Sequence, residues 1–211
     1  MSRDDGVARV FDQWAADGRD QKLAEGHHHS VHTFLNTMDW SGQFSFLDVG
    51  CGNGWVVRRM ASYGTCTRAV GIDKSGGMIK RARAMARRHV EEYHAASLEE
   101  WSAPPFDVVF SMESLYYSPS VPDAISKVYS LLVPGGTFVC GTDYYAENPD
   151  TAGWADMMGV TMHMYSESEW LEMLKEAGFW TSATHVTDPG SDARWKRDAG
   201  TLFMIGMHPK K

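Results

Sequence analysis

The chain has 211 residues, with 20 Lys and Arg against 27 Asp and Glu, giving a formal net charge of −7. A hydrophobic fraction of 43% and a mean hydropathy of −0.35 exclude a wholly disordered or fibrous chain. The acidic balance argues against a general nucleic-acid binder. Three cysteines without CxxC spacing suggest neither a disulfide framework nor a zinc site. With no apolar run long enough to span a bilayer, the sequence predicts a cytoplasmic protein.

From about residue 40 onward, short β-rich runs alternate with helical patterns. We expect strands at 44–49, 67–72, 106–110 and 136–141, and helices at 55–63, 78–90, 123–132 and 167–177. This alternation predicts a parallel sheet with helices on both faces, a Rossmann-like three-layer α/β sandwich. The last runs, 181–187 and 202–207, lack an intervening helical pattern and predict a terminal antiparallel hairpin with a polar connection, which completes a seven-stranded, mostly parallel sheet.

The whole chain, 1–211, is expected to form a single domain with four parts. These are a helical cap (1–40), a cofactor-binding core (42–145), an acceptor-side insertion (146–166), and a C-terminal helix and hairpin (167–211). Nine basic residues and one acid fall between Arg58 and His89, so the charge is uneven. We expect this stretch to form a solvated helical face.

The most informative segment is 48–54, with the sequence DVGCGNG, between a predicted strand and a predicted helix. Glycines at such a turn let a ligand approach the backbone. Dinucleotide enzymes place a third glycine where this chain has Trp55. Here the pattern is G-x-G-x-G, preceded by the acid Asp48, which suits a cationic amino group. Asp73, at the end of the second strand, is placed to accept both ribose hydroxyl hydrogen bonds.

Together with 71–73 (GID), 106–109 (FDVV) and 132–136 (LVPGG), this segment resembles the successive motifs of class I S-adenosylmethionine-dependent methyltransferases. The chain is most similar to the small-molecule branch that includes ubiquinone and menaquinone methylases. The resemblance covers roughly residues 42–180. It implies S-adenosylmethionine as the cofactor, S-adenosylhomocysteine as the product, and methyl transfer to a small, hydrophobic or aromatic acceptor.

The resemblance also implies roles for individual positions. Asp48 and the backbone of the glycine turn would hold the methionine moiety, Asp73 the ribose, and Met78 would lie along the adenine. Ser97 stands where an acid that meets the adenine amino group is common. The full cofactor set is Asp48, Gly50, Cys51, Gly52, Gly54, Asp73, Lys74, Met78, Ser97, Leu98 and Ser111.

Candidate catalytic residues follow the fourth and fifth strands, because ligands of open parallel sheets collect beyond the carboxyl ends of the strands. A base must lie near the proton of the acceptor. Glu113, Asp143 and Tyr145 come from these loops, and His27 from the cap. Each has a structural alternative: Glu113 as a helix cap or a partner of backbone amides, Asp143 as an Asx-turn residue, and the histidines 27–29 as a solvated helix start.

The insertion contains Trp154, Met157, Met158, Met162 and Met164. A flexible, polarizable, apolar surface suits a hydrophobic acceptor, and core packing beneath a long loop is the alternative. No carboxylates and histidines are spaced as a metal site, so no metal is expected.

Rival functions lack their signatures. Residues 111–114 read SMES where an amino-directed DNA methylase needs Asp/Asn-Pro-Pro-aromatic, and no cysteine follows the fourth strand for cytosine-C5 chemistry. Nucleic acid is thus an unlikely partner on sequence grounds. The alternatives left open are an RNA or tRNA methyltransferase that uses the basic helix, and a non-catalytic S-adenosylmethionine-binding protein.

Overall fold

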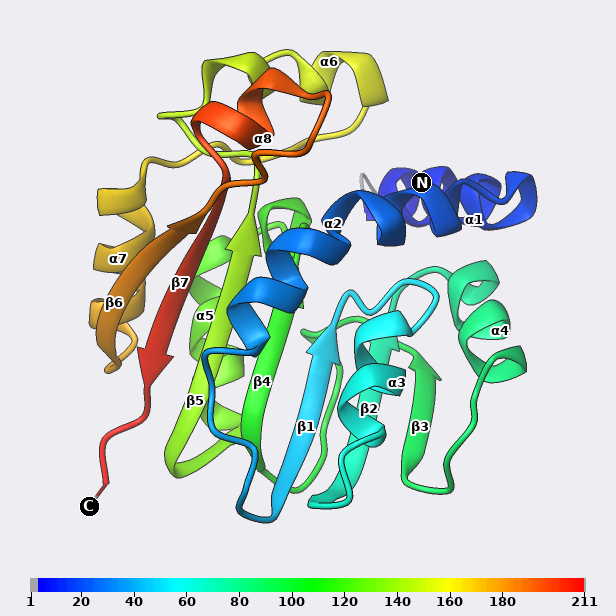
Figure 1. Ribbon diagram of the computed structural model, residues 1–211, viewed down its shortest axis with the longest axis vertical. Helices are drawn as coiled ribbons and strands as arrows, with labels where there is room; N and C mark the ends of the chain where they lie inside the picture. The colour runs from blue at the N-terminus through cyan, green and yellow to red at the C-terminus, as the bar shows by residue number, and fades with distance from the viewer. Residues whose placement is uncertain (1–3, 211) are drawn as a thin grey trace.

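The computed structural model describes residues 4–210, which form a seven-stranded sheet of order β3-β2-β1-β4-β5-β7-β6 (Figure 1). The strands are β1 (Phe44–Val49), β2 (Cys66–Asp73), β3 (Glu91–Ala95), β4 (Phe106–Met112), β5 (Leu132–Thr142), β6 (Trp180–Val186) and β7 (Thr201–Met207). Strands β1 to β5 pair in parallel, and β7 pairs antiparallel with both β5 and β6. The predicted Rossmann-like sheet with its antiparallel C-terminal hairpin is confirmed.

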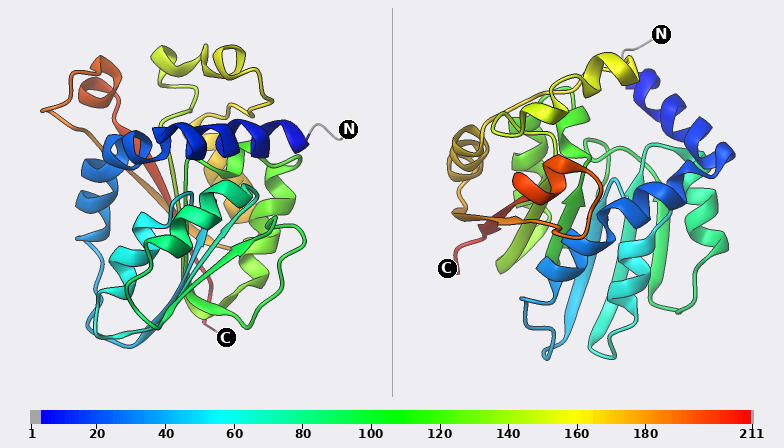
Figure 2. Two further views of the ribbon diagram at one scale, coloured as in Figure 1. Left: turned by 90° about the vertical axis from the view of Figure 1, so that its right-hand side faces the viewer. Right: turned by 45° about the horizontal axis from the view of Figure 1, so that its top comes forward.

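Helices cover both faces of this sheet (Figure 2). They are α1 (Asp4–Asp17), α2 (Arg19–Leu35), α3 (Trp55–Ala61), α4 (Gly76–Ala84), α5 (Val121–Ser130), α6 (Trp154–Met158), α7 (Glu167–Glu176) and α8 (Arg194–Asp198), with 3₁₀ turns η1 (Leu115–Tyr117) and η2 (Pro149–Thr151). Their ends carry ordinary capping chemistry. The Ser120 hydroxyl accepts the Asp123 N–H at the start of α5, and Ser166 and Glu169 form a capping box on α7.

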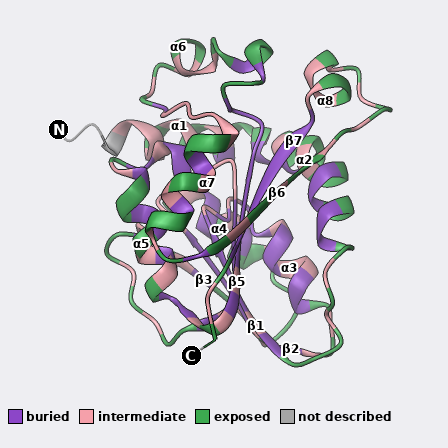
Figure 3. Cartoon of the chain, turned by 90° about the vertical axis from the view of Figure 1, so that its left-hand side faces the viewer, coloured by how far each residue is buried: buried purple, intermediate pink, exposed green. Residues whose placement is uncertain are grey.

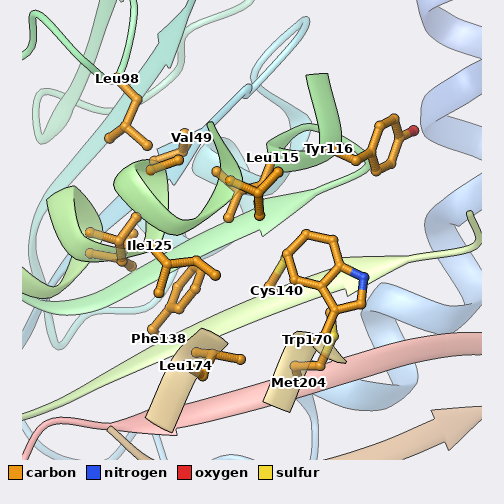
Figure 4. Packing of buried hydrophobic residues seen from close by; sticks show 14 of the residues in the cluster. Val49, Leu98, Leu115, Tyr116, Ile125, Phe138, Cys140, Trp170, Leu174 and Met204 are labelled. Carbon is orange, nitrogen blue, oxygen red and sulfur yellow. The ribbon is translucent and has the colours of Figure 1, made fainter. Parts of the chain in front are cut away.

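Two hydrophobic clusters lie on opposite faces of the sheet. On one face, α5 and α7 pack Ile125, Trp170 and Leu174 against strand residues such as Phe138 (Figure 4). On the other face, α2, α3 and α4 form a second cluster with the strands that includes Phe34, Phe46, Val57, Met60 and Ile79. Figure 3 shows the corresponding pattern, with the sheet-facing sides of the helices buried and their outer sides exposed.

The predicted N-terminal cap is confirmed: α1 and the start of α2 lie across the carboxyl ends of the parallel strands (Figure 1). Two acids attach these helices to the body. Asp12 of α1 accepts hydrogen bonds from the Ser75 hydroxyl (2.6 Å) and the Gly77 N–H (2.9 Å) at the start of α4. Asp20 of α2 is buried and accepts hydrogen bonds from Arg81 Nε (2.8 Å) and Asn53 Nδ2 (2.9 Å). The cap is therefore joined directly to the glycine turn.

Some predicted element boundaries are wrong. Helix α4 ends at Ala84 rather than near residue 90, because the Glu91 carboxylate accepts the N–H groups of Arg87 and Arg88 and stabilises a turn into β3. Residues 134–136 lie inside β5 rather than before it, since the Gly135 N–H donates to His208 O and the His208 N–H donates to Gly136 O. The connection between β6 and β7 contains a short helix, α8.

Within the described residues, no helix is both long and apolar enough to cross a membrane.

Candidate active site

The site lies where β1, β2, β4 and β5 end at the same edge of the sheet. The turn after β1 is the glycine turn, β2 ends at Asp73, Glu113 follows β4, and Asp143 follows β5. Because parallel strands deliver their carboxyl ends to one edge, residues far apart in the sequence meet here. The helices α1, α2, α6 and α8 lie over this edge (Figure 1).

A cavity of about 750 Å³ opens between this edge and the cap. Ten of the predicted site residues line it: His27, Asp48, Gly50, Cys51, Gly52, Asp73, Lys74, Met78, Leu98 and Glu113. Five others, Gly54, Ser97, Ser111, Asp143 and Tyr145, are not among its lining residues. The cavity thus brings together residues from the cap, the glycine turn and the ends of four strands.

Glycine is needed at different positions of the turn for different physical reasons. Gly50, Gly52 and Gly54 all adopt positive φ (73°, 51° and 77°). A Cβ on Gly54 would lie 2.5 Å from the Tyr93 ring, so Gly54 permits close packing of the turn on β3 rather than ligand contact. A Cβ on Gly52 would meet nothing within 4 Å. Because Gly52 lines the cavity, that open space is where a ligand can approach the backbone.

Two carboxylates stand beside the turn. Asp73 accepts the Gly52 N–H (2.9 Å) on one oxygen and the Ser75 N–H (2.8 Å) on the other, so it ties the glycine turn to the end of β2. Asp48 is buried and lines the cavity. Burial and the nearby charge of Asp73 raise the pKa of Asp48 well above its usual value. A buried carboxylate in this setting favours a positively charged ligand group.

The residues expected around the adenine are only partly brought to the cavity. Met78, which is buried, and Leu98 line it. The Ser97 hydroxyl instead accepts the Glu100 N–H (3.2 Å) and stabilises the local turn. The neighbouring Glu99, which the sequence did not single out, lines the cavity with its carboxylate 3.5 Å from Lys74 Nζ. Glu99 is therefore the acidic side chain of this segment that faces a ligand.

Two further predicted cofactor residues have their side chains occupied by the protein. The Ser111 hydroxyl is buried and donates to Val49 O (3.0 Å), which joins β4 to β1. The Cys51 thiol is buried and lies 3.7 Å from Gly52 O, and burial raises its pKa well above the usual value. A neutral thiol of this kind packs as a small apolar wall.

The φ angle of Glu113 is 52°. Among the described residues, Glu113 is the non-glycine residue with a positive φ. One carboxylate oxygen accepts the Tyr116 hydroxyl (2.6 Å), and the other accepts the Asp143 N–H in a short hydrogen bond. Burial and the charge of Asp143 raise the pKa of Glu113 to about 7. Glu113 thus joins the loops after β4 and β5, and backbone strain of this kind is typical of functional sites.

His27 of α2 lies against Asp143, with 3.3 Å between Nδ1 and a carboxylate oxygen. The other oxygen of Asp143 accepts the Thr201 hydroxyl (2.6 Å), and Asp143 itself is fully buried behind His27. Burial lowers the pKa of His27, but the contact with Asp143 and the negative charges of Asp143 and Glu113 outweigh it, so the net shift is upward. The contact is electrostatic rather than a hydrogen bond, since neither His27 Nδ1 nor that Asp143 oxygen has a hydrogen-bond partner among the described residues.

Tyr145 lies elsewhere. Its hydroxyl donates to the backbone oxygens of Ala199 (3.1 Å) and Gly200 (3.2 Å), and its ring packs against His185. These contacts join the loop after β5 to the start of β7. The position favours a structural role for Tyr145.

The part of the cavity away from the glycine turn is walled by apolar residues, and the sequence predicted only some of them. Trp154, Met157 and Met158 of the insertion line it, and Trp154 and Met158 also pack against the core cluster, as do the buried Met162 and the half-buried Met164. The missed wall is the apolar stripe of the cap, consisting of Val7, Val10, Phe11, Trp14 and Leu23. The spacing of the first four along one helix is the signal that could have identified them.

The C-terminal connection adds Trp195 and Lys196 to the wall. Trp195 packs edge-on against Trp154 (5.5 Å between ring centroids), and the Lys196 ammonium donates a short hydrogen bond to Gly26 O beside His27. These contacts join α8 to the insertion and to the cap. Only the fold brings the three segments together. In the described part of the chain, no group of three or more His, Cys, Asp or Glu side chains is arranged to hold a metal ion.

Comparison with known proteins agrees with this geometry. Residues 47–140 match the family described as a methyltransferase domain. The chain is 36% identical over 99 residues to a ubiquinone biosynthesis O-methyltransferase of Aromatoleum aromaticum, and 25% identical over 162 residues to a sterol 24-C-methyltransferase of Candida albicans. These alignments cover 43% and 70% of this chain, and 40% and 43% of the relatives, so the chain spans less than half the length of each.

The fold is also similar to a solved structure from Haloferax volcanii, a methyltransferase in complex with the Trm112 methyltransferase activator. The TM-score is 0.90 at 27% identity, over 94% of this chain and 97% of that one. Other solved structures of the same fold are S-adenosylhomocysteine complexes. Residues 47–140 therefore match a methyltransferase domain, and S-adenosylmethionine is the cofactor that the comparisons support.

Proposed function

We propose that the protein transfers the methyl group of S-adenosylmethionine to a small acceptor with a large apolar part. The observation that carries this proposal is the composition of the cavity at the strand ends. It is lined on one side by the glycine turn with Asp48 and Asp73, and on the other by the apolar residues of α1, α2 and α6. Such a cavity has room for a polar cofactor and an apolar acceptor together.

The residues present fit the cofactor. The open space beside Gly52 admits a ligand against the backbone, and the buried carboxylate of Asp48 would accept a cationic amino group. Asp73 would hold the ribose hydroxyls, with Met78 and Leu98 against the adenine and Glu99 near its edge. When bound, the cofactor supplies an activated methyl carbon, so the protein contributes orientation and proton transfer.

For proton transfer we propose His27 as the general base. His27 lines the cavity, and an oxygen of Asp143 lies 3.3 Å from its Nδ1, so we assign Nε2 as the nitrogen that takes a proton from the acceptor. Asp143 is a positioning residue, because it is buried and does not line the cavity. Glu113 is proposed to fix the Asp143 loop, since both of its oxygens accept hydrogen bonds from that loop and from Tyr116.

The apolar wall and the two relatives support the acceptor class. The named activities of those relatives concern sterol and ubiquinone biosynthesis, both of which involve large apolar molecules. The test is a screen of sterols, phenols, quinone precursors and small polar acids, followed by formation of S-adenosylhomocysteine. We expect turnover with apolar acceptors. Turnover confined to polar acids or to RNA would contradict the proposal.

We also propose that the protein works with a partner protein. The similarity to the Haloferax volcanii methyltransferase extends over nearly the whole of both chains, and that protein is in complex with an activator. Purification of the tagged chain from its own host, with turnover measured before and after the co-purifying protein is removed, tests this. Unchanged turnover by the isolated chain would contradict it. A cytoplasmic location stays the prediction of the sequence.

A further inference from the structure

A second cavity, of about 530 Å³, lies on the other side of α2 from the first. Four arginines line it: Arg58 and Arg59 of α3, and Arg87 and Arg88 of the turn after α4. We call this the arginine pocket; it is also lined by Gln21, Ala24, Glu25, His28, Trp55, Ser62 and Met85. Ala24 and Trp55 line both cavities, so the two adjoin (Figure 1 shows α2, α3 and α4 on one face).

The predicted solvated face of the basic stretch is therefore divided into two parts. Arg68, Arg81 and Lys74 contact carboxylates of the protein at 3.2, 2.8 and 3.5 Å, and Arg83 donates to Tyr93 O. The four pocket arginines differ: among the residues described, no carboxylate lies within ion-pair distance of their side chains. Four of the nine basic residues, all without such a carboxylate, thus line one cavity.

Hydrogen bonds to the protein fix the guanidinium groups of two of the four arginines. Arg58 Nη1 donates to Asn53 O (2.6 Å), and Arg59 Nη2 donates to Asn36 Oδ1 (2.8 Å). Arg59 Nε is buried and has no hydrogen-bond partner within the described structure. A buried donor without a partner is costly and points to a ligand acceptor.

Two neighbouring acids offset only part of this charge, since four arginines stand against one acid in the lining and one beside it. Glu25 is the acid among the lining residues, and its carboxylate accepts a hydrogen bond from Gln21 (3.1 Å). The Glu91 carboxylate is occupied by the backbone N–H groups of Arg87 and Arg88. Burial and, after it, the positive charges of Arg59 and the neighbouring histidines lower the pKa of His32, whose ring stacks on His28 of the pocket. The balance of four arginines against these two acids leaves a positive potential here, in a chain whose net charge is −7.

We propose that the arginine pocket binds a small phosphate-bearing anion. Guanidinium groups stay charged at every physiological pH and present paired N–H groups that match phosphate oxygens. Four of them around a concave cavity repel one another, and a multivalent anion between them would relieve that repulsion. A terminal phosphate or pyrophosphate supplies that charge within the volume of the pocket, and Trp55 with His28 (5.9 Å between ring centroids) provides an aromatic wall beside it.

The experiment is isothermal titration calorimetry of the full chain with pyrophosphate at low salt. The test variant is R87A/R88A, since both side chains are exposed and neither supports the core. The control is K175A/R194A, which removes two exposed positive charges outside both cavities. We expect saturable binding that weakens about tenfold or more in R87A/R88A and changes at most about twofold in the control.

Absence of saturable binding by the wild-type chain, or equal weakening in both double variants, would overturn the proposal. A mixed-sequence RNA oligonucleotide is titrated in parallel to identify the source of the phosphate. Preference for pyrophosphate supports the small ligand. Preference for the RNA by more than about tenfold would assign the pocket to a phosphodiester backbone and contradict the small-ligand proposal. Because only binding is measured, failure here is distinguishable from failure of methyl transfer.

Discussion

The two walls of the main cavity are built in different ways. The cofactor wall consists of backbone turns at strand ends, and its key residues, Asp48, Gly52 and Asp73, fall within 26 residues of one another. The wall proposed to hold the acceptor, which we call the acceptor wall, consists of side chains from α1, α2, α6 and α8. The first wall is a local motif on a shared scaffold. The second exists only after the cap and the C-terminal connection have docked, so this is where acceptor specificity can vary without loss of the cofactor site.

The largest expected effect comes from filling the cofactor wall. G52V places a branched side chain in the open space beside the turn, and we expect S-adenosylhomocysteine affinity to fall about 100-fold or more. G159V is the matched control, because Gly159 also has positive φ (65°) and open space but does not line the cavity. Calorimetry on both variants measures the effect. Normal binding by a folded G52V chain would contradict the cofactor assignment.

The next largest effect concerns His27, the proposed base. H27A is expected to lower kcat/KM about 100-fold with cofactor affinity unchanged, because it removes the proposed base. The base must be neutral to act, so activity should rise with pH through the raised pKa of His27. D143N removes the main charge that raises this pKa, so the activity profile should move to lower pH. A pH–rate profile for D143N identical to that of the wild type would remove Asp143 as a positioning residue.

Truncation of the acceptor wall should give a smaller effect, confined to the acceptor. F11A removes an aromatic ring of α1 that lines the cavity and packs edge-on against Tyr117 (5.6 Å between centroids). We expect KM for an apolar acceptor to rise about tenfold, the equivalent of burying one less aromatic side chain, while cofactor affinity stays the same. Steady-state kinetics and calorimetry together measure this. A parallel loss of cofactor affinity would show that the two walls are not independent.

The smallest effect concerns stability. The pKa of Glu113 is raised to about 7 in the folded protein, so the folded state binds a proton that the unfolded chain releases at lower pH. This contribution to stability is present below the unfolded pKa and is lost as pH rises through about 7. E113Q cannot titrate, so relative to wild type it should gain on the order of 1 kcal/mol between about pH 5 and about pH 8. Urea unfolding of both proteins at both pH values tests this. If the difference in unfolding free energy between E113Q and wild type is the same at the two pH values, the prediction is contradicted.

The difference between the walls also explains what the sequence could predict. The glycine turn and Asp73 follow from spacing and from the strand pattern, because their roles depend on local backbone geometry. The dyad of His27 and Asp143 joins residues 116 positions apart, and the Thr201 hydroxyl behind it comes from a different strand. Periodicity could place each on an element but could not bring the elements together. At Ser97 a local contact made the prediction wrong. The Ser97 hydroxyl, expected to face the ligand, instead accepts the Glu100 N–H within its own turn.

The arginine pocket likewise shows a feature that the fold determines and the sequence alone does not. One run of basic residues looked uniform in the sequence, yet the fold gives some of them internal partners and gathers four around a cavity. The difference arises because α4 ends early and the turn at Arg87 and Arg88 points toward α3. Helical periodicity had continued that helix to residue 90.

A crystal structure with S-adenosylhomocysteine tests the central claim, that one cavity brings the cofactor and the proposed base together. The account predicts that the amino group lies at Asp48 and the ribose hydroxyls at Asp73, with the sulfur toward the side of the cavity that contains His27 and the apolar residues of α1. A product bound with its sulfur directed away from His27, or bound outside this cavity, would contradict it.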